Sequence, residues 1–222
     1  MRWSEQVNNY CERTGFGFWS EPVNAMTNAA FLVAALWLWR RSQGVPLARA
    51  LCVILFAIGI GSFLFHTTAT RWAGLADTLP ILLFILTYIL AVNLHVWRWR
   101  WWVAALGTLA FVPYAAAVTP VFAALPFFAV SSVYWAVPLL ISVYAALLWR
   151  RHRRTARGLA IGAANLCASL VFRSVDGGVC SAFPLGTHFM WHILNAVMLG
   201  WMIAVYVRHM TQGGGGKALH GA

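Results

Sequence analysis

Charged side chains are scarce in this chain, because only 9% of its 222 residues are Asp, Glu, Lys or Arg, whereas 61% are hydrophobic. A soluble domain carries about 25% charged residues. The shortage argues against a soluble fold. Together with a mean hydropathy of +0.72, it predicts a multi-span membrane protein with one compact domain.

Lysine is almost absent, and the one lysine, Lys217, lies in the C-terminal tail. A retinal-binding seven-helix pump needs a Schiff-base lysine within a helix, so that class is excluded. The net charge of +11 does not indicate a nucleic-acid partner. The basic residues form short runs at the ends of apolar segments, as the positive-inside rule expects. The preference for Arg over Lys is compatible with a GC-rich, bacterial genome.

Seven apolar segments are each about long enough to cross a bilayer. Their approximate limits are 24–40, 47–66, 74–95, 101–119, 127–149, 158–174 and 186–207. The fourth and fifth are the least clearly separated, because three prolines and little polarity lie between Pro113 and Pro126. We therefore expect an all-α integral membrane domain of seven transmembrane helices over residues 1–210. An outer loop would occupy 1–23, and a flexible tail 211–222.

The distribution of basic residues predicts the orientation of the chain. Most of them follow the first, third, fifth and seventh segments, which share one side only if the number of spans is odd. The N-terminus should then be outside and the C-terminus cytoplasmic. All the acids fall on the outer side in this arrangement, which indicates that chemistry or ion binding occurs there. They are Glu5, Glu12, Glu21, Asp77 and Asp176.

Three histidines, His66, His188 and His192, lie within or at the edge of apolar segments. His188 and His192 are four positions apart, so they share one helix face and can bind one metal ion. The second segment runs outward and the seventh inward, which brings His66 to the same outer depth. Asp77 opens the third segment at that depth too. The pattern predicts a metal site formed by three helices, which a transporter or scaffold with structural histidines would not explain.

Three neutral imidazoles with an open fourth position are typical of a catalytic zinc site. A nearby carboxylate can accept a proton from the attacking water and deliver it to a leaving amine, the role expected for Asp77. Ser62 precedes His66 by one turn and could bond Asp77 or a developing oxyanion. An equally good interpretation of Ser62 is a helix serine bonded to a backbone carbonyl.

A second polar cluster precedes the first segment, where Glu12 and Glu21 flank a loop rich in glycine and aromatic residues. Oxygen ligands on such a loop can bind calcium, although no EF-hand spacing is present. The alternative is a loop beside the membrane with aromatic anchors and a polar cap on the first helix. Cys11 and Cys180 both fall on the outer side, where a disulfide between them could form.

Together these motifs resemble the alkaline ceramidases, seven-helix zinc amidases in a superfamily that includes the adiponectin-receptor type. The motifs are YCE (10–12), EPVNAMTN (21–28), GSFLFH (61–66), LADTLP (75–80), VDGGVC (175–180) and HFMWHIL (188–194). The resemblance implies zinc ligands, a catalytic pair beside the metal and one disulfide. These are, in order, His66, His188 and His192; Asp77 and Ser62; and Cys11 with Cys180.

Members of that family bind calcium near the N-terminus. The corresponding positions here are Asn9, Tyr10 (through its carbonyl), Glu12, Thr14 and Glu21. This sequence departs from the pattern, because Asn9 replaces the first acidic ligand, Thr14 replaces an Asn, and the loop before Glu21 is shorter. One carboxylate fewer should weaken calcium binding.

The sequence thus predicts a zinc hydrolase of a bacterial inner membrane, with its active site towards the outer side. Ceramide-like lipids would enter from the bilayer and be cleaved to a sphingoid base and a fatty acid. The alternative is a receptor or sensor of the adiponectin-receptor type with a structural or slowly hydrolytic zinc site. The short N-terminus and the YCE…EP pattern favour the hydrolase.

Overall fold

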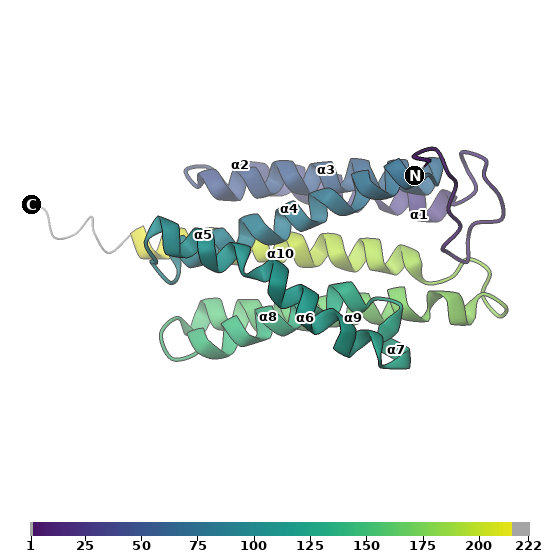
Figure 1. The fold of residues 1–222 in the computed structure, drawn as a ribbon. Helices are drawn as coiled ribbons and strands as arrows, with labels where there is room; N and C mark the ends of the chain where they lie inside the picture. Colours follow the sequence, from purple (N-terminus) through teal and green to yellow (C-terminus); the bar gives the residue numbers. More distant parts are fainter. Residues whose placement is uncertain (1, 215–222) are drawn as a thin grey trace, which may run out of the picture.

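The computed structural model describes residues 2–214, and within that range its regular secondary structure is entirely helical (Figure 1). The helices are α1 (Pro22–Thr27), α2 (Ala29–Arg41), α3 (Pro46–Thr68), α4 (Arg71–His95), α5 (Trp101–Leu109), α6 (Phe111–Ala123), α7 (Pro126–Ala129), α8 (Ser132–Leu148), α9 (Arg153–Val179) and α10 (His188–Gly214). Proline stands in the first turn of α1, α3 and α7, where its missing N–H leaves no helical hydrogen bond unmade.

Six helical stretches in the described part of the chain are long and apolar enough to cross a membrane. They are Pro22–Arg41, Pro46–Thr68, Arg71–His95, Trp101–Ala123, Arg153–Val179 and His188–Gln212. The remaining apolar segment of the sequence is divided between α7 and α8, and α8 has only 17 residues. The all-helical membrane architecture is confirmed, while a seventh span and the orientation of the termini stay predictions.

Two helices extend well beyond the apolar limits seen in the sequence. α9 begins at Arg153 and reaches Val179, because helical hydrogen bonding continues through the polar residues that flank the apolar segment. α10 continues to Gly214. The first four residues of the expected tail are therefore helical, and residues 215–222 of that tail lie outside the described part of the chain.

Most helices lie roughly along one long axis, with the N-terminal loop at one end and the last turns of α10 at the other (Figure 1). α10 packs against α2, α3 and α9, and α3 packs along α4. α3 ends where α4 and α10 begin, at the end covered by the N-terminal loop. The topology therefore gathers the last turns of α3 and the first turns of α4 and α10.

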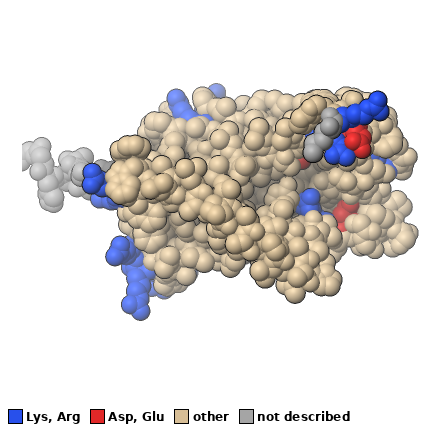
Figure 2. All heavy atoms as spheres, in the orientation of Figure 1, with Lys and Arg blue, Asp and Glu red and all other residues tan. Residues whose placement is uncertain are grey.

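The outer surface of the bundle carries large apolar side chains, such as Trp37, Leu79 and Val197, each more than half exposed. Such a surface suits lipid rather than water. On the face shown in Figure 2, the acidic atoms all lie towards the end of the N-terminal loop. At the opposite end of this face, the only charged atoms in view are basic. This segregation is the one expected from the sequence.

The N-terminal segment is fastened over the turn between α3 and α4. Val7 N donates to Ala69 O at 2.8 Å, and Arg71 N donates to Glu5 O at 3.0 Å. A disulfide joins Cys11 to Cys180, with the two Cα atoms 5.2 Å apart, as expected from the sequence. The loop thereby closes the end of the bundle at which α3, α4 and α10 meet.

Candidate metal centre

His66 near the end of α3 and His188 and His192 on the first turns of α10 form one buried cluster. Each is at most 2% exposed, and one ring nitrogen from each lies within 4.8 Å of the others. His188 and His192 point the same way because they are one helical turn apart. Within the described residues, no other group of three or more His, Cys, Asp or Glu side chains is placed to hold a metal ion.

The three rings each hold a buried nitrogen that has no hydrogen-bond partner: His66 Nε2, His188 Nδ1 and His192 Nε2. A buried polar atom left unpaired costs about 1–3 kcal/mol. Three such atoms in one place fit a shared partner that accepts lone pairs from imidazole, as a zinc ion does. The three histidines that the sequence indicated as zinc ligands therefore lie together, and their free ring nitrogens suit zinc.

Two of the three rings are also held at their other nitrogen, and the third is held at its face. His66 Nδ1 donates to Glu21 Oε2 at 2.5 Å, and His192 Nδ1 shares a hydrogen bond of 3.0 Å with Thr27 Oγ1. Tyr10 stacks on His188, with ring centroids 3.7 Å apart. Partners of this kind orient metal-binding imidazoles and fix their tautomers, and a carboxylate partner also makes the ring a stronger ligand.

Asp77 and Ser62 meet beside the histidines, where α3 and α4 touch. Ser62 is 4% exposed and directly follows Gly61, which lies against the backbone of Ala76 and Asp77. Gly61 makes this approach possible, because a Cβ built on it would stand 2.1 Å from the carbonyl oxygen of Ala76. Asp77, the expected acid/base group, and Ser62, its expected hydrogen-bond donor one helical turn before His66, therefore both lie at the contact between α3 and α4.

Glu12 caps the start of α1. Its two carboxylate oxygens accept from the backbone N–H groups of Val23 and Asn24 at 2.7 and 2.8 Å. This contact agrees with the second interpretation of the N-terminal cluster, a polar cap on the first helix. Asn9 and Thr14, two of the expected calcium ligands, are exposed.

Glu21 is buried, and both of its carboxylate oxygens accept from protein donors. It accepts from Arg13 Nε, from His66 Nδ1 and from Asn24 Nδ2, the last at 3.1 Å. Burial alone would raise the pKa of Glu21, but the hydrogen bond from His66 and the charge of Arg13 hold it below its usual value. A calcium ion at the expected site would have to compete with Arg13, His66 and Asn24 for the Glu21 oxygens, so these residues fit a calcium ion poorly.

Asp176, which the sequence placed only among the outer acids, fixes the start of α10. Its Oδ1 accepts from Thr187 N at 2.7 Å and from His188 N at 2.9 Å, and its Oδ2 accepts from Cys11 N at 3.2 Å. An acid at a helix N-terminus satisfies its free N–H groups and favours its dipole. Asp176 thus positions His188, and its place in the VDGGVC motif beside Cys180 was the available signal.

Arg173 on α9 is a second residue without a role assigned from the sequence. It donates to Val130 O and Ser131 Oγ at 3.0 and 2.9 Å, and its guanidinium lies over Tyr134 and Trp191. These contacts hold a positive charge beside Trp191, the residue that precedes His192. No local pattern in the sequence distinguishes Arg173 from a loop arginine.

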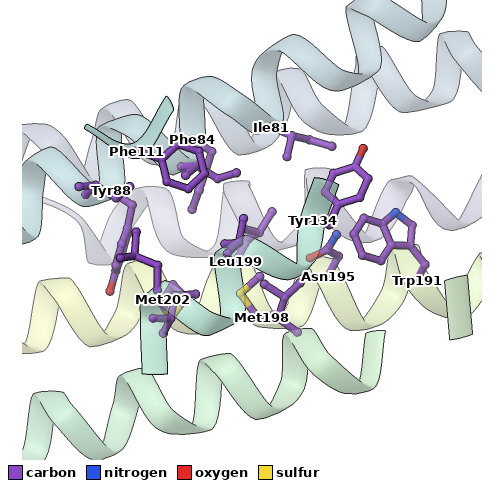
Figure 3. A pocket seen from close by; sticks show the side chains of 16 residues that line it. Ile81, Phe84, Tyr88, Phe111, Tyr134, Trp191, Asn195, Met198, Leu199 and Met202 are labelled. Carbon is purple, nitrogen blue, oxygen red and sulfur yellow. The ribbon is translucent and has the colours of Figure 1, made fainter. Parts of the chain in front are cut away.

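An apolar pocket extends between α4, α8 and α10 from Trp191 and Asn195, which flank His192 in the sequence, towards Tyr88 and Met202 (Figure 3). Tyr134, Trp191 and Asn195 lie at one end of the pocket, and Tyr88 and Met202 lie at the other. Aliphatic and aromatic side chains make up nearly all of its wall. The pocket offers space for an apolar group next to the histidine cluster.

Comparison with known protein families gives one match. The Ceramidase family matches residues 5–219, which is nearly the whole chain and includes the histidines, Asp77 and both disulfide cysteines. No curated protein gives a significant match. The chain belongs to the ceramidase family, whose members are hydrolases that act on amides.

Proposed function

We propose that this protein is a zinc-dependent intramembrane hydrolase that cleaves the amide bond of ceramide-like N-acyl sphingoid lipids. The products would be a sphingoid base and a fatty acid. The observation that carries the proposal is the convergence of three unpartnered ring nitrogens, from His66, His188 and His192, in a member of the ceramidase family. Asp77 and Ser62 beside them supply the remaining groups that an amide hydrolysis needs.

A zinc ion held by His66, His188 and His192 would supply Lewis-acid chemistry, polarising the amide carbonyl and lowering the pKa of water to about 7. Asp77 would accept a proton from the attacking water as the water oxygen bonds to the carbonyl carbon. Asp77 then protonates the nitrogen as the C–N bond breaks, so the amine leaves neutral. Ser62 donates a hydrogen bond to the Asp77 carboxylate or to the oxyanion that develops on the carbonyl oxygen.

The apolar pocket supports a lipid substrate. Trp191 precedes His192 and Asn195 follows it by three positions, so the pocket wall is continuous with the face of α10 that carries the histidine. One hydrocarbon chain lies in this pocket while the amide is held at the metal. Met198 and Met202 in the wall have flexible side chains that adapt to the shape of a chain.

We place the protein in the inner membrane of a bacterium, with seven spans, the N-terminus outside and the metal centre towards the outer side. The segregation of charge supports this placement, since Arg residues alone mark the end opposite the N-terminal loop on the face in Figure 2. The disulfide supports it as well, because the outer compartment is the oxidising one. Substrate enters sideways from the outer half of the bilayer.

The test is hydrolysis of a panel of N-acyl sphingoid lipids by the purified full-length protein, with chelator and with zinc added back. We expect release of sphingoid base, loss of the activity with chelator and its return with zinc. An ester of the same chain length serves as the control for non-specific lipase activity. If no N-acyl lipid is hydrolysed under conditions in which the protein holds zinc, the proposal is wrong and a receptor of the adiponectin-receptor type becomes the better interpretation.

A further inference from the structure

The guanidinium of Arg13 is enclosed beside the metal centre, with its side chain 1% exposed. Its Nε donates to Glu21 Oε1, its Nη1 to the carbonyl of Gly15 at 2.9 Å, and its Nη2 to the carbonyl of His66 at 2.8 Å. All three nitrogens of the group thus have an oxygen acceptor. A buried charge of this kind is retained only when it is paired and fully hydrogen-bonded.

Arg13 reaches His66 by two routes. In the first route, Arg13 holds one oxygen of the Glu21 carboxylate, and the other oxygen accepts from His66 Nδ1 and so orients the imidazole. Through its own Nη2, it also holds the backbone carbonyl of the same histidine. The ring and the backbone of one proposed metal ligand are therefore both tied to a single guanidinium from the N-terminal loop.

The acceptors of Arg13 are a carboxylate and two backbone carbonyls, which are the oxygen types that a calcium ion takes. A calcium ion needs six to eight such ligands. Here Glu21 is already shared between Arg13, His66 and Asn24, and both oxygens of Glu12 bond the backbone of α1. The positive charge beside Glu21 is thus supplied by the guanidinium of Arg13.

We propose that Arg13 is a positioning residue that acts as a built-in cation in place of calcium, so that the metal centre is organised without calcium. The proposal rests on the proposed function only in taking His66 as a metal ligand. It explains why the loop lacks the acidic ligand at Asn9, because the guanidinium already neutralises Glu21.

The first experiment measures metal affinity without any lipid. The full-length protein is freed of metal and titrated with Co²⁺, whose visible spectrum reports the number and geometry of its ligands. Replacement of a residue that supports a ligand costs about 10–100-fold in metal affinity. We expect that loss, with an altered spectrum, in Arg13→Ala, and a smaller loss in Arg13→Lys, which keeps the charge but not the planar fork.

The matched control is Arg71→Ala, since Arg71 pairs with Glu5 at the same end of the bundle but both side chains are largely exposed. It should bind Co²⁺ like the unmodified protein. Co²⁺ affinity and spectrum in Arg13→Ala equal to those of the Arg71→Ala control would overturn the positioning role. Arg13→Lys, which retains the charge, keeps this comparison possible if Arg13→Ala does not fold.

The second experiment needs no variant. The zinc-loaded protein is unfolded thermally with increasing CaCl₂ and, in parallel, with MgCl₂ at the same ionic strength. A ligand that binds only the folded state raises the unfolding temperature with its concentration. We expect identical unfolding temperatures in the two salts, and a rise specific to calcium would refute the proposal. Neither readout depends on catalysis, so an absence of lipid hydrolysis would count against the proposed function alone.

Discussion

His66 shows how much of the site depends on contacts between residues far apart in the chain. Its Nε2 faces the other histidines without a partner, while its Nδ1 and its carbonyl are held by Glu21 and Arg13 from the N-terminal loop. A zinc ligand must be both deprotonated and correctly turned to bind. The loop residues supply the orientation, and the helix supplies the position.

The prediction at this scale concerns Asp77. Asp77→Asn removes the group that accepts and returns the proton but leaves the three histidines untouched. Loss of a general acid/base costs about 10²–10⁴-fold in turnover. We expect zinc content equal to that of the unmodified protein and turnover lower by that factor, measured on the same preparation. Unchanged turnover would exclude Asp77 as the base.

The histidines and Asp77 could be predicted from the sequence because their signal is local. His188 and His192 share a helix face by spacing alone, and charge counting brings His66 and Asp77 to the same depth. The pairing of Arg13 with Glu21 and His66 could not be predicted, because it depends on the path of an irregular loop. The sequence interpretation assigned Glu12 and Glu21 to calcium because it could not show which donors bond them. In the structure the Val23 N–H bonds Glu12 and Arg13 bonds Glu21.

At the scale of elements, the close approach of α3 and α4 sets the distance between the metal ligands and the acid/base group. Gly61 permits it, because any side chain there would collide with the backbone of Ala76. In the sequence this glycine is only a small residue within an apolar segment. The limits of α3 were predicted closely, as 47–66 against Pro46–Thr68, whereas its contact with α4 was not predicted.

We expect Gly61→Ala to push α4 away from α3. Overpacking of this kind costs about 1–3 kcal/mol of stability. A displacement of about 1 Å at a catalytic group can cost about 10²-fold in rate. Turnover should therefore fall more than zinc content. The control is Gly178→Ala, since a Cβ there meets nothing within 4 Å. Equal turnover in the two variants would show that the helix contact does not position Asp77.

The disulfide ties the N-terminal loop to the segment between α9 and α10, across a sequence separation of 169 residues. Loss of a native disulfide typically costs about 2–5 kcal/mol. The double variant Cys11→Ser/Cys180→Ser should unfold at a lower temperature, while Cys167→Ala, which changes a free cysteine, should lower it less. A double variant as stable as the control would show that the loop is held without the covalent bond.

For the whole molecule, the basic end and the acidic end define the expected orientation. A phosphatase that folds only outside the cytoplasm and a fluorescent protein that matures only inside it can each be fused to the C-terminus. Because Arg residues concentrate on the expected cytoplasmic side, we expect fluorescence and no phosphatase activity in cells. An active phosphatase fusion would reverse the orientation and place the metal centre towards the cytoplasm.

The fold class and the end of the bundle that carries the site follow from hydropathy and charge, since both reflect the energetics of insertion into a bilayer. The number of membrane spans is harder to predict from the sequence. α8 is short and follows a break at the end of α7, so hydropathy alone does not show whether this segment crosses. The prolines in this part of the sequence do not mark the breaks between helices, because Pro120 and Pro138 lie inside α6 and α8 and Pro126 begins α7.

The central claim is that His66, His188 and His192 hold a zinc ion that hydrolyses a lipid amide. The most direct measurement is the metal content and the ceramide hydrolysis of the purified protein and of His192→Ala, side by side. The account predicts about one zinc per chain with hydrolysis in the former, and loss of both in the variant. Full hydrolysis by a metal-free His192→Ala protein would contradict it.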